Sequence, residues 1–340
     1  MLLPQNVTGN KQDWATYVTV TDEHETPLLK LIGKGSKPVN RLYQYQVDAF
    51  TAPTPRQWPD GKDVDAYSSA GQNRAELNAR VQKFVQTAAV SLMAQDVTNA
   101  AGVDDELARE VKKKFEEMAR DIECSAASDQ LAQIDDGVNA DRFQGMGLWL
   151  QNGTANQLYP VPTSPIDYTT PAASVYSGVK GSLTEDAIRA LLESRWLATG
   201  KSKTNLLLVV GSQLKQRFSS FTYYIPSSLS TQSTARVSNR SITDTTLGFN
   251  VDVYNSEFGT FELHLSPWNA NANYTGGSSG KSAWRGYGLS PSMWEWRWNQ
   301  MPTVWREEFK GGSYKAAIYA ILLLCCRTPL DGIKIAPSDA

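Results

Sequence analysis

Residues 49–82 read AFTAPTPRQWPDGKDVDAYSSAGQNRAELNARVQ. Prolines, glycines and polar residues dominate this stretch, and PTP, WPDG and AGQN are turn signals. A compact domain seldom carries so long a connection with so little to bury. The composition therefore predicts a polar tip that projects from the body of the protein.

The segments on either side of this stretch predict the two strands of a long, open hairpin. Before it, RLYQYQVDAF (41–50) alternates and places Tyr43 and Tyr45 on one face. After it, ARVQKFVQTAAVSLM (79–93) is rich in branched and aromatic residues such as Phe84, and it lacks glycine. The hairpin would run out along one segment and return along the other.

Residues 104–128, DDELAREVKKKFEEMARDIECSAAS, predict the clearest helix of the chain. Apolar residues recur every three or four positions from Val103 to Ile122, and the acidic residues of the first turn suit the helix dipole. At 1.5 Å per residue the helix would be roughly 37 Å long. Its opposite face carries charged side chains, namely Lys112, Lys113, Glu116, Glu117 and Arg120.

A second unit begins near residue 180 and predicts an α+β domain with a small mixed sheet. SLTEDAIRALLESRWLATG (182–200) opens with a capping box from Ser182 to Glu185 and ends in glycine, which predicts a helix. The elements after it are a strand buried on both faces, a short helix and two alternating strands, at 204–211, 212–221, 248–255 and 259–266.

The C-terminal part of the chain predicts another long hairpin. SMWEWRWNQMPTVWREEF (292–309) places Trp294, Trp296 and Trp298 on one face of a strand, and YKAAIYAILLLCC returns after a KGGS turn. A hairpin with one strongly apolar face needs a helix or another chain to cover it.

Composition argues against several classes of protein. The net charge is −2, with 33 basic and 35 acidic residues, so no basic surplus indicates a nucleic-acid-binding face. Cys124, Cys325 and Cys326 form no disulfide framework, which favours a reducing compartment. The longest apolar run, 316–326, is too short to span a bilayer, and we expect no membrane association.

The sequence also predicts no catalytic, metal-binding or cofactor-binding residues. His24 and His264 have no partner at metal-ligand spacing. TGGSSGKSAW (275–284) is similar to a phosphate-binding loop, but Thr275 stands where the first glycine should be, and neither a strand nor a helix flanks it. A surface loop is the favoured interpretation.

The order of these elements resembles the major capsid proteins of tailed phages with the Hong Kong 97-like (HK97-like) fold, and most of all the SU10-like major head proteins. The resemblance covers most of residues 26–335 and rests on the order and spacing of its segments. These segments are TPLLKLI (26–32), YQYQVDAF (43–50), NRAELNARVQKFVQTAAVS (73–91), DELAREVKKKFEEMARDIE (105–123), RFQGMGLWL (142–150), the α+β segments with VYNSEFGTFELHLSPW (253–268), and the tryptophan-rich hairpin.

The resemblance implies a division of the chain into named parts. These are an N-terminal arm (1–40), an extended loop with flanking peripheral-domain strands (41–98), a spine helix with peripheral domain (99–148), an axial domain (149–290), the long peripheral-domain hairpin (291–328), and a C-terminal strand or tail of the axial domain (329–340).

The resemblance further implies a structural subunit that assembles with itself. Pentamers and hexamers would build an icosahedral shell that encloses double-stranded DNA, assembled in the host bacterial cytoplasm and retained in the virion. Scaffold, cement or decoration, and portal proteins are the further partners implied, and the DNA would lie near the wall without specific contacts. Contacts between subunits are expected from the extended loop (Arg56, Trp58, Lys62 and Tyr67) and from the charged helix face described above.

Two alternatives stay open at this point. Ten tryptophans and polar loops would also suit a tail or decoration protein that binds carbohydrate. Less favoured is an enzyme that uses the loop at 275–284 as a phosphate site. Exposed aromatic platforms would support the first alternative, whereas tryptophans buried beneath the long helix would argue against it.

Overall fold

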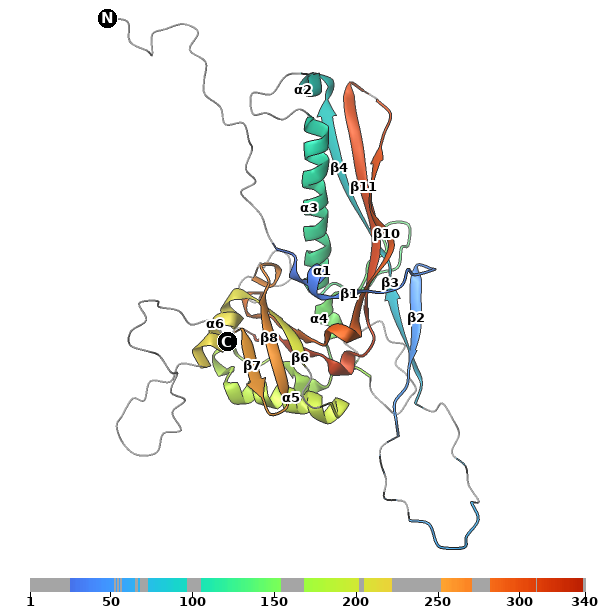
Figure 1. Cartoon of the computed structure of the whole chain (residues 1–340), viewed down its shortest axis with the longest axis vertical. Helices are drawn as coiled ribbons and strands as arrows, with labels where there is room; N and C mark the ends of the chain where they lie inside the picture. Colours follow the sequence, from blue (N-terminus) through green and yellow to red (C-terminus); the bar gives the residue numbers. More distant parts are fainter. Residues whose placement is uncertain are drawn as a thin grey trace, which may run out of the picture.

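The structure, a computed structural model, describes residues 25–51, 53, 55, 57–64, 67, 73–96, 105–153, 168–201, 205–221, 252–270, 282–309 and 311–338. A long helix lies along a narrow sheet, a second sheet domain sits at the foot of this helix, and a hairpin points away from both (Figure 1).

The narrow sheet has four strands in the order β1-β10-β11-β4. Its strands are β1 (Gly33–Lys34), β10 (Trp294–Arg306), β11 (Ser313–Cys326) and β4 (Gln82–Ser91). β1 is parallel to β10, and the other pairs are antiparallel. β10 and β11 are the predicted C-terminal hairpin, and Gly311 and Gly312 in its turn have φ of 69° and 73°, where only glycine is unstrained.

Helix α3 (Glu106–Ala127) is the predicted long helix and packs on β4 and β11 (Figure 1). It begins after Asp105, whose side chain accepts a hydrogen bond from the Ala108 N–H at 2.9 Å, an N-cap arrangement. Met118 and Ile122 on its apolar stripe are buried against the sheet. Trp294 and Trp296, on one face of the hairpin, are also buried and belong to the same core.

The projecting hairpin consists of β2 (Leu42–Val47) and β3 (Ala75–Arg80), paired from Leu42↔Arg80 to Val47↔Ala75. The prediction of a hairpin is confirmed, but its returning limb is two strands rather than one. β3 pairs with β2, whereas β4 leaves the hairpin and pairs with β11. β4 changes partner because this pairing buries Phe84 in the apolar core beneath α3.

The second sheet is mixed and has the order β5-β12-β9-β6-β8-β7. Its strands are β5 (Val175–Tyr176), β12 (Ile333–Ile335), β9 (Gly286–Leu289), β6 (Asn205–Val210), β8 (Gly259–Leu265) and β7 (Val253–Ser256). The predicted mixed sheet is confirmed, and with it the α+β class. Phe249 and Val251, expected to open the strand at 248–255, lie outside the described residues.

Strand β6 joins two cores, as expected of a strand buried on both faces. Leu206, Leu208 and Val210 pack with α5 (Glu185–Thr199) and α6 (Ser212–Phe221). Leu207 and Val209 on its other face belong to the core beneath α3. The two sheets are therefore parts of one packed body.

The predicted capping box of α5 is wrong in its first residue. The N-cap is Thr184, whose side chain accepts from the Ala187 N–H, and Ser182 lies in the preceding 3-10 turn, η4 (Lys180–Ser182). Leu183 between them is fully buried, which places Thr184 at the start of the helix. The C-terminal glycine is confirmed, since Gly200 has φ of 66°.

Short helices connect these elements. They are α1 (Pro27–Leu31), α2 (Leu92–Asp96), α4 (Met146–Trp149), η3 (Ala172–Ser174), η5 (Trp268–Ala270), η6 (Ser282–Trp284), η7 (Pro291–Met293) and η8 (Pro329–Asp331).

Candidate assembly surfaces

The tip of the projecting hairpin has a local structure of its own. The Lys62 N–H donates to the Pro59 carbonyl at 3.4 Å, and Gly61 takes φ of 74° in this turn. The Trp58 indole N–H donates to the Lys62 carbonyl at 2.8 Å, and the Lys62 ammonium lies 5.8 Å from the ring centroid. The structure therefore brings two of the predicted contact residues together, with the indole 55% exposed.

The structure describes one of the other two predicted contact residues of the loop. Tyr67 is 87% exposed, and Arg56 lies outside the described residues. Phe50 is 98% exposed at the base of the loop and was not predicted as a contact. The sequence did contain a signal for this contact, because Phe50 is a large apolar residue directly before a polar stretch. Such side chains gain contacts only when another surface covers them.

The predicted charged face of α3 is open to solvent over its middle turns. Lys112, Lys113 and Glu116 are exposed. Glu117 is half-buried and forms an ion pair with Lys114, and Arg120 is also half-buried. The charged face of α3 therefore carries an exposed lysine pair, Lys112 and Lys113. It is followed one to two turns later by the half-buried Glu117 and Arg120.

The face of the four-stranded sheet opposite α3 is a further exposed surface that the sequence analysis missed. Val85 of β4 and Trp305 of β10 are exposed large apolar residues there. The Lys83 ammonium lies 4.8 Å from the ring centroid of Tyr319 on the same face. Alternation along β4 was the available signal, because its helix-facing residues leave Lys83 and Val85 pointing the other way.

Arg297 of β10 fixes the root of the hairpin. Its guanidinium lies 4.1 Å from the ring centroid of Tyr43 in β2 and donates to the Ser36 hydroxyl at 2.6 Å. It also forms an ion pair with Glu295 at 2.8 Å. The Tyr45 hydroxyl donates to the Cys326 carbonyl close by. A buried cation thus joins the N-terminal segment, the hairpin and the sheet.

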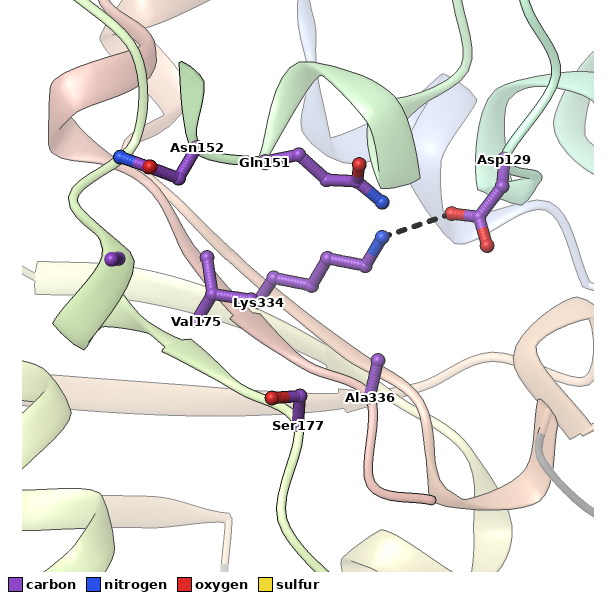
Figure 2. A pocket seen from close by; sticks show the side chains of 8 residues that line it. Asp129, Gln151, Asn152, Val175, Ser177, Lys334 and Ala336 are labelled. Atoms are coloured by element: carbon purple, nitrogen blue, oxygen red, sulfur yellow. Dashed lines mark hydrogen bonds and ion pairs between the residues drawn. The ribbon is translucent and has the colours of Figure 1, made fainter. Parts of the chain in front are cut away.

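A second polar junction lies where α3 meets the six-stranded sheet (Figure 2). Asp129 follows the end of α3 and accepts from the Lys334 ammonium of β12 at 3.1 Å. The same carboxylate pairs with Arg285 at 2.7 Å, and Lys334 also donates to the Gly147 carbonyl. Burial lowers the pKa of Lys334, and the Asp129 carboxylate opposes that shift.

The Lys334 side chain runs along the wall of a pocket of about 420 Å³ (Figure 2). The other lining residues come from the loop after α4 and from the edge of the sheet, namely Gln151, Asn152, Ala172, Val175, Ser177 and Ala336, with Asp129 at one end. The Lys334 ammonium is bound by Asp129 and by the Gly147 carbonyl. We therefore interpret this junction as a structural contact between α3 and the six-stranded sheet.

The described residues offer neither a metal site nor a membrane-spanning helix. They contain no cluster of three or more histidine, cysteine, aspartate or glutamate side chains arranged to hold a metal ion. None of their helices combines the length and apolarity that a bilayer span needs. His264 lies 3.5 Å from Glu262 on the same strand. The loop at 275–284 is outside the described residues except for its last three, which form η6.

The same fold is found in solved structures of phage capsids. The capsid of cyanophage P-SCSP1u matches with a TM-score of 0.63 at 9% identity, covering 100% of this chain and 97% of that one. The capsid of the Myoviridae phage XM1 matches with a TM-score of 0.57 at 11% identity, covering 99% of both chains. The mature capsid of bacteriophage PhiM1 matches with a TM-score of 0.58 at 11% identity, covering 97% and 93%.

At these identities the structures show the fold, which is HK97-like as the resemblance implied. A comparison with curated proteins found no match. The model of the SU10 major capsid protein family matches residues 3–336, almost the whole chain. The projecting hairpin, the long helix on its narrow sheet and the mixed sheet domain are thus those of a phage head subunit, and the chain belongs to the SU10 major capsid protein family.

Proposed function

We propose that this major capsid protein assembles into pentamers and hexamers of an icosahedral shell around double-stranded DNA, with the projecting hairpin as its principal contact. The observation that carries the proposal is the tip itself. Its Trp58–Lys62 turn is held by its own hydrogen bond and leaves Trp58 55% exposed, with the Lys62 ammonium over the ring. An aromatic side chain presented on a rigid turn is a typical anchor of a protein interface.

The charged face of α3 in a neighbouring copy is the surface that we propose receives the tip. Asp60 and Asp63 flank Lys62 on the tip, and both are exposed. Lys112 and Lys113 form an exposed basic pair on α3. Opposite charges on the two surfaces favour this pairing and set its register. Arg56, Tyr67, Glu116, Glu117 and Arg120 complete the proposed contact set, and repetition around closed symmetry makes individually weak contacts cooperative.

The named parts of the chain are kept as part of the proposal, with the boundaries given above. Their support is the connectivity of the sheets. The long hairpin β10–β11 shares a sheet with β4, whereas the C-terminal strand β12 returns to the six-stranded sheet. The four-stranded sheet would then be the peripheral domain and the six-stranded sheet the axial domain, with α3 between them.

The proposed role is structural, without an enzymatic step. Assembly in the host cytoplasm, and contacts with scaffold, cement and portal proteins, are proposed from the family alone. The near-neutral net charge of −2 suits a wall that stays close to DNA without binding it tightly. The carbohydrate-binding alternative loses its main basis because several tryptophans are buried, namely Trp149, Trp268, Trp294 and Trp296.

A charge exchange tests the pairing of tip and helix. We expect Lys112→Glu/Lys113→Glu to reduce shell yield at least tenfold, because the acidic tip then meets an acidic face. Asp60→Lys/Asp63→Lys should do the same. The two pairs combined in one chain should restore assembly, measured as the shell fraction in a sucrose gradient.

Lys34→Glu/Lys37→Glu is the matched control, since it makes the same charge change at exposed lysines away from α3. It should leave the shell yield unchanged. Normal assembly of both single reversals, or no rescue when they are combined although each variant folds, would show that the tip docks elsewhere.

A further inference from the structure

A small pocket lies at the root of the projecting hairpin, between β2 and the four-stranded sheet, and has a volume of about 210 Å³. β2 and the sheet both contribute to its lining, which includes Tyr43, Tyr45, Gln46, Arg297, Cys325 and Arg327. The lining thus contains two guanidinium groups and no carboxylate, and its other side chains are of uncharged types. The pocket is therefore positively charged.

The two arginines share one acidic partner among the described residues. Glu295 of β10 lies outside the pocket lining, with its Oε2 at 2.8 Å from the Arg297 guanidinium and its Oε1 paired with Arg327. Two guanidinium groups against one carboxylate leave one positive charge unmatched. Arg297 is only 6% exposed, and a buried charge is stable only when it is paired.

Other groups at the pocket do not supply the missing negative charge. Burial raises the pKa of the Cys325 thiol to about 11, so this lining side chain stays neutral near pH 7. Arg297 donates to the Ser36 hydroxyl at 2.6 Å, but its Nε–H has no acceptor among the described residues. The pocket therefore combines an unmatched charge with a guanidinium whose donors are not all used.

We propose that this pocket binds a small tetrahedral oxyanion of the phosphate type, which holds the root of the hairpin against the sheet. The Arg327 side chain is 52% exposed, so an anion reaches its guanidinium without a change of fold. A guanidinium presents parallel N–H groups that match two oxygens of a phosphate, and phenol or amide donors of β2 suit the others. The inference concerns a single chain and does not depend on which surfaces meet in a shell.

An anion at this position would change how firmly the hairpin is held. Arg297 already joins the parts of the root, because its guanidinium lies 4.1 Å from the ring centroid of Tyr43 and bonds to Ser36. Arg327 carries a like charge on the other side of Glu295. A bound anion relieves the repulsion between the two guanidinium groups and contacts both walls of the pocket. We therefore expect β2 to open less often when phosphate is bound.

Hydrogen exchange followed by mass spectrometry tests this effect on the full-length subunit. Calorimetric titration with inorganic phosphate first gives the dissociation constant. Exchange in peptides that cover residues 41–48 is then compared in phosphate and in chloride at equal ionic strength and pH. At a phosphate concentration about ten times the dissociation constant, protection of β2 should rise about tenfold. A peptide within α5 is the internal reference and should not change.

Matched variants separate the pocket from the general stabilisation that phosphate gives by exclusion from protein surfaces. Arg327→Gln removes the exposed guanidinium and should weaken phosphate binding about tenfold or more, together with the gain in β2 protection. Arg189→Gln makes the same change at a half-exposed arginine of α5 that also pairs with a glutamate, and it should keep both.

Three results would overturn the proposal. They are wild-type phosphate affinity in Arg327→Gln, a gain of protection that is equal in β2 and α5, and acetate binding as tight as phosphate binding. Acetate should bind more weakly, because it offers a single charge and two oxygens. If Arg327→Gln does not fold, the exchange experiment on the wild-type chain, with its α5 reference, decides alone.

Discussion

A chain that lacks residues 53–72 should fold into a soluble subunit and fail to form shells. The Trp58–Lys62 hydrogen bond lies within this segment, and the pairing of β2 with β3 lies outside it and should survive its removal. The ends of the deletion are already close, since the Asn73 side-chain amide donates to the Ala49 carbonyl at 2.9 Å. Thermal unfolding should therefore change by only a few degrees, whereas electron microscopy should show no closed particles.

A chain with residues 53–72 replaced by glycine and serine of equal length is the matched control for loop length. It should also fail to assemble, because the anchoring side chains are absent although the reach of the loop is kept. Normal shells from the deletion variant would show that the tip is not a principal contact. Shells from the glycine–serine variant alone would show that length, rather than Trp58 and its neighbours, is what assembly needs.

Asp129→Asn should be among the most destabilising single substitutions in the protein. The Asp129 carboxylate forms ion pairs with Lys334, as Figure 2 shows, and with Arg285. Both cations are largely buried at the junction of α3 with the six-stranded sheet. Removing the charge of Asp129 takes this carboxylate away from both cations, and loss of one partner of a buried ion pair costs about 3–5 kcal/mol. Chemical denaturation of the unassembled subunit would measure this loss.

Lys334→Met is the control for this junction. It removes one cation but leaves Asp129 paired with Arg285, and the methionine occupies much of the space of the lysine stem. We expect a smaller loss of unfolding free energy than in Asp129→Asn. An Asp129→Asn subunit as stable as the wild type would mean that water, rather than this carboxylate, stabilises the two cations.

The sequence was most informative where local pattern and tertiary burial agree. The stripe that ends at Ile122 predicted α3 to within two residues at its start, and the tryptophan alternation identified the buried face of the first residues of β10. Gly200, Gly311 and Gly312 all take the left-handed conformation that their positions after a helix or within a turn require.

Local pattern was less informative where two candidates compete for one role. Ser182 and Thr184 are both good N-cap residues, and only the burial of Leu183 between them decides in favour of Thr184. The change of partner between β3 and β4 is a similar case. A continuous strand-like segment does not reveal that its first half pairs with β2 and its second half with β11.

The contacts at the candidate surfaces also differ in whether the sequence could predict them. Trp58 and Lys62 could be expected to meet, because a turn separates them by only four residues. Glu123, whose side chain accepts from the Leu28 N–H of α1, and Asp129 could not have been recognised, since their partners lie 95 and 205 residues away along the chain. A glutamate in the RDIE sequence has the same local pattern whether it is solvated or buried, and only the fold places α1 over it.

Electron microscopy of the full-length protein, produced with the scaffold and portal proteins of its phage, tests the central claim most directly. We predict closed polyhedral particles of uniform size, in which each subunit places its 53–67 segment against α3 of a neighbouring copy. A protein that stays monomeric under these conditions, or particles in which that segment contacts no other chain, would contradict the claim.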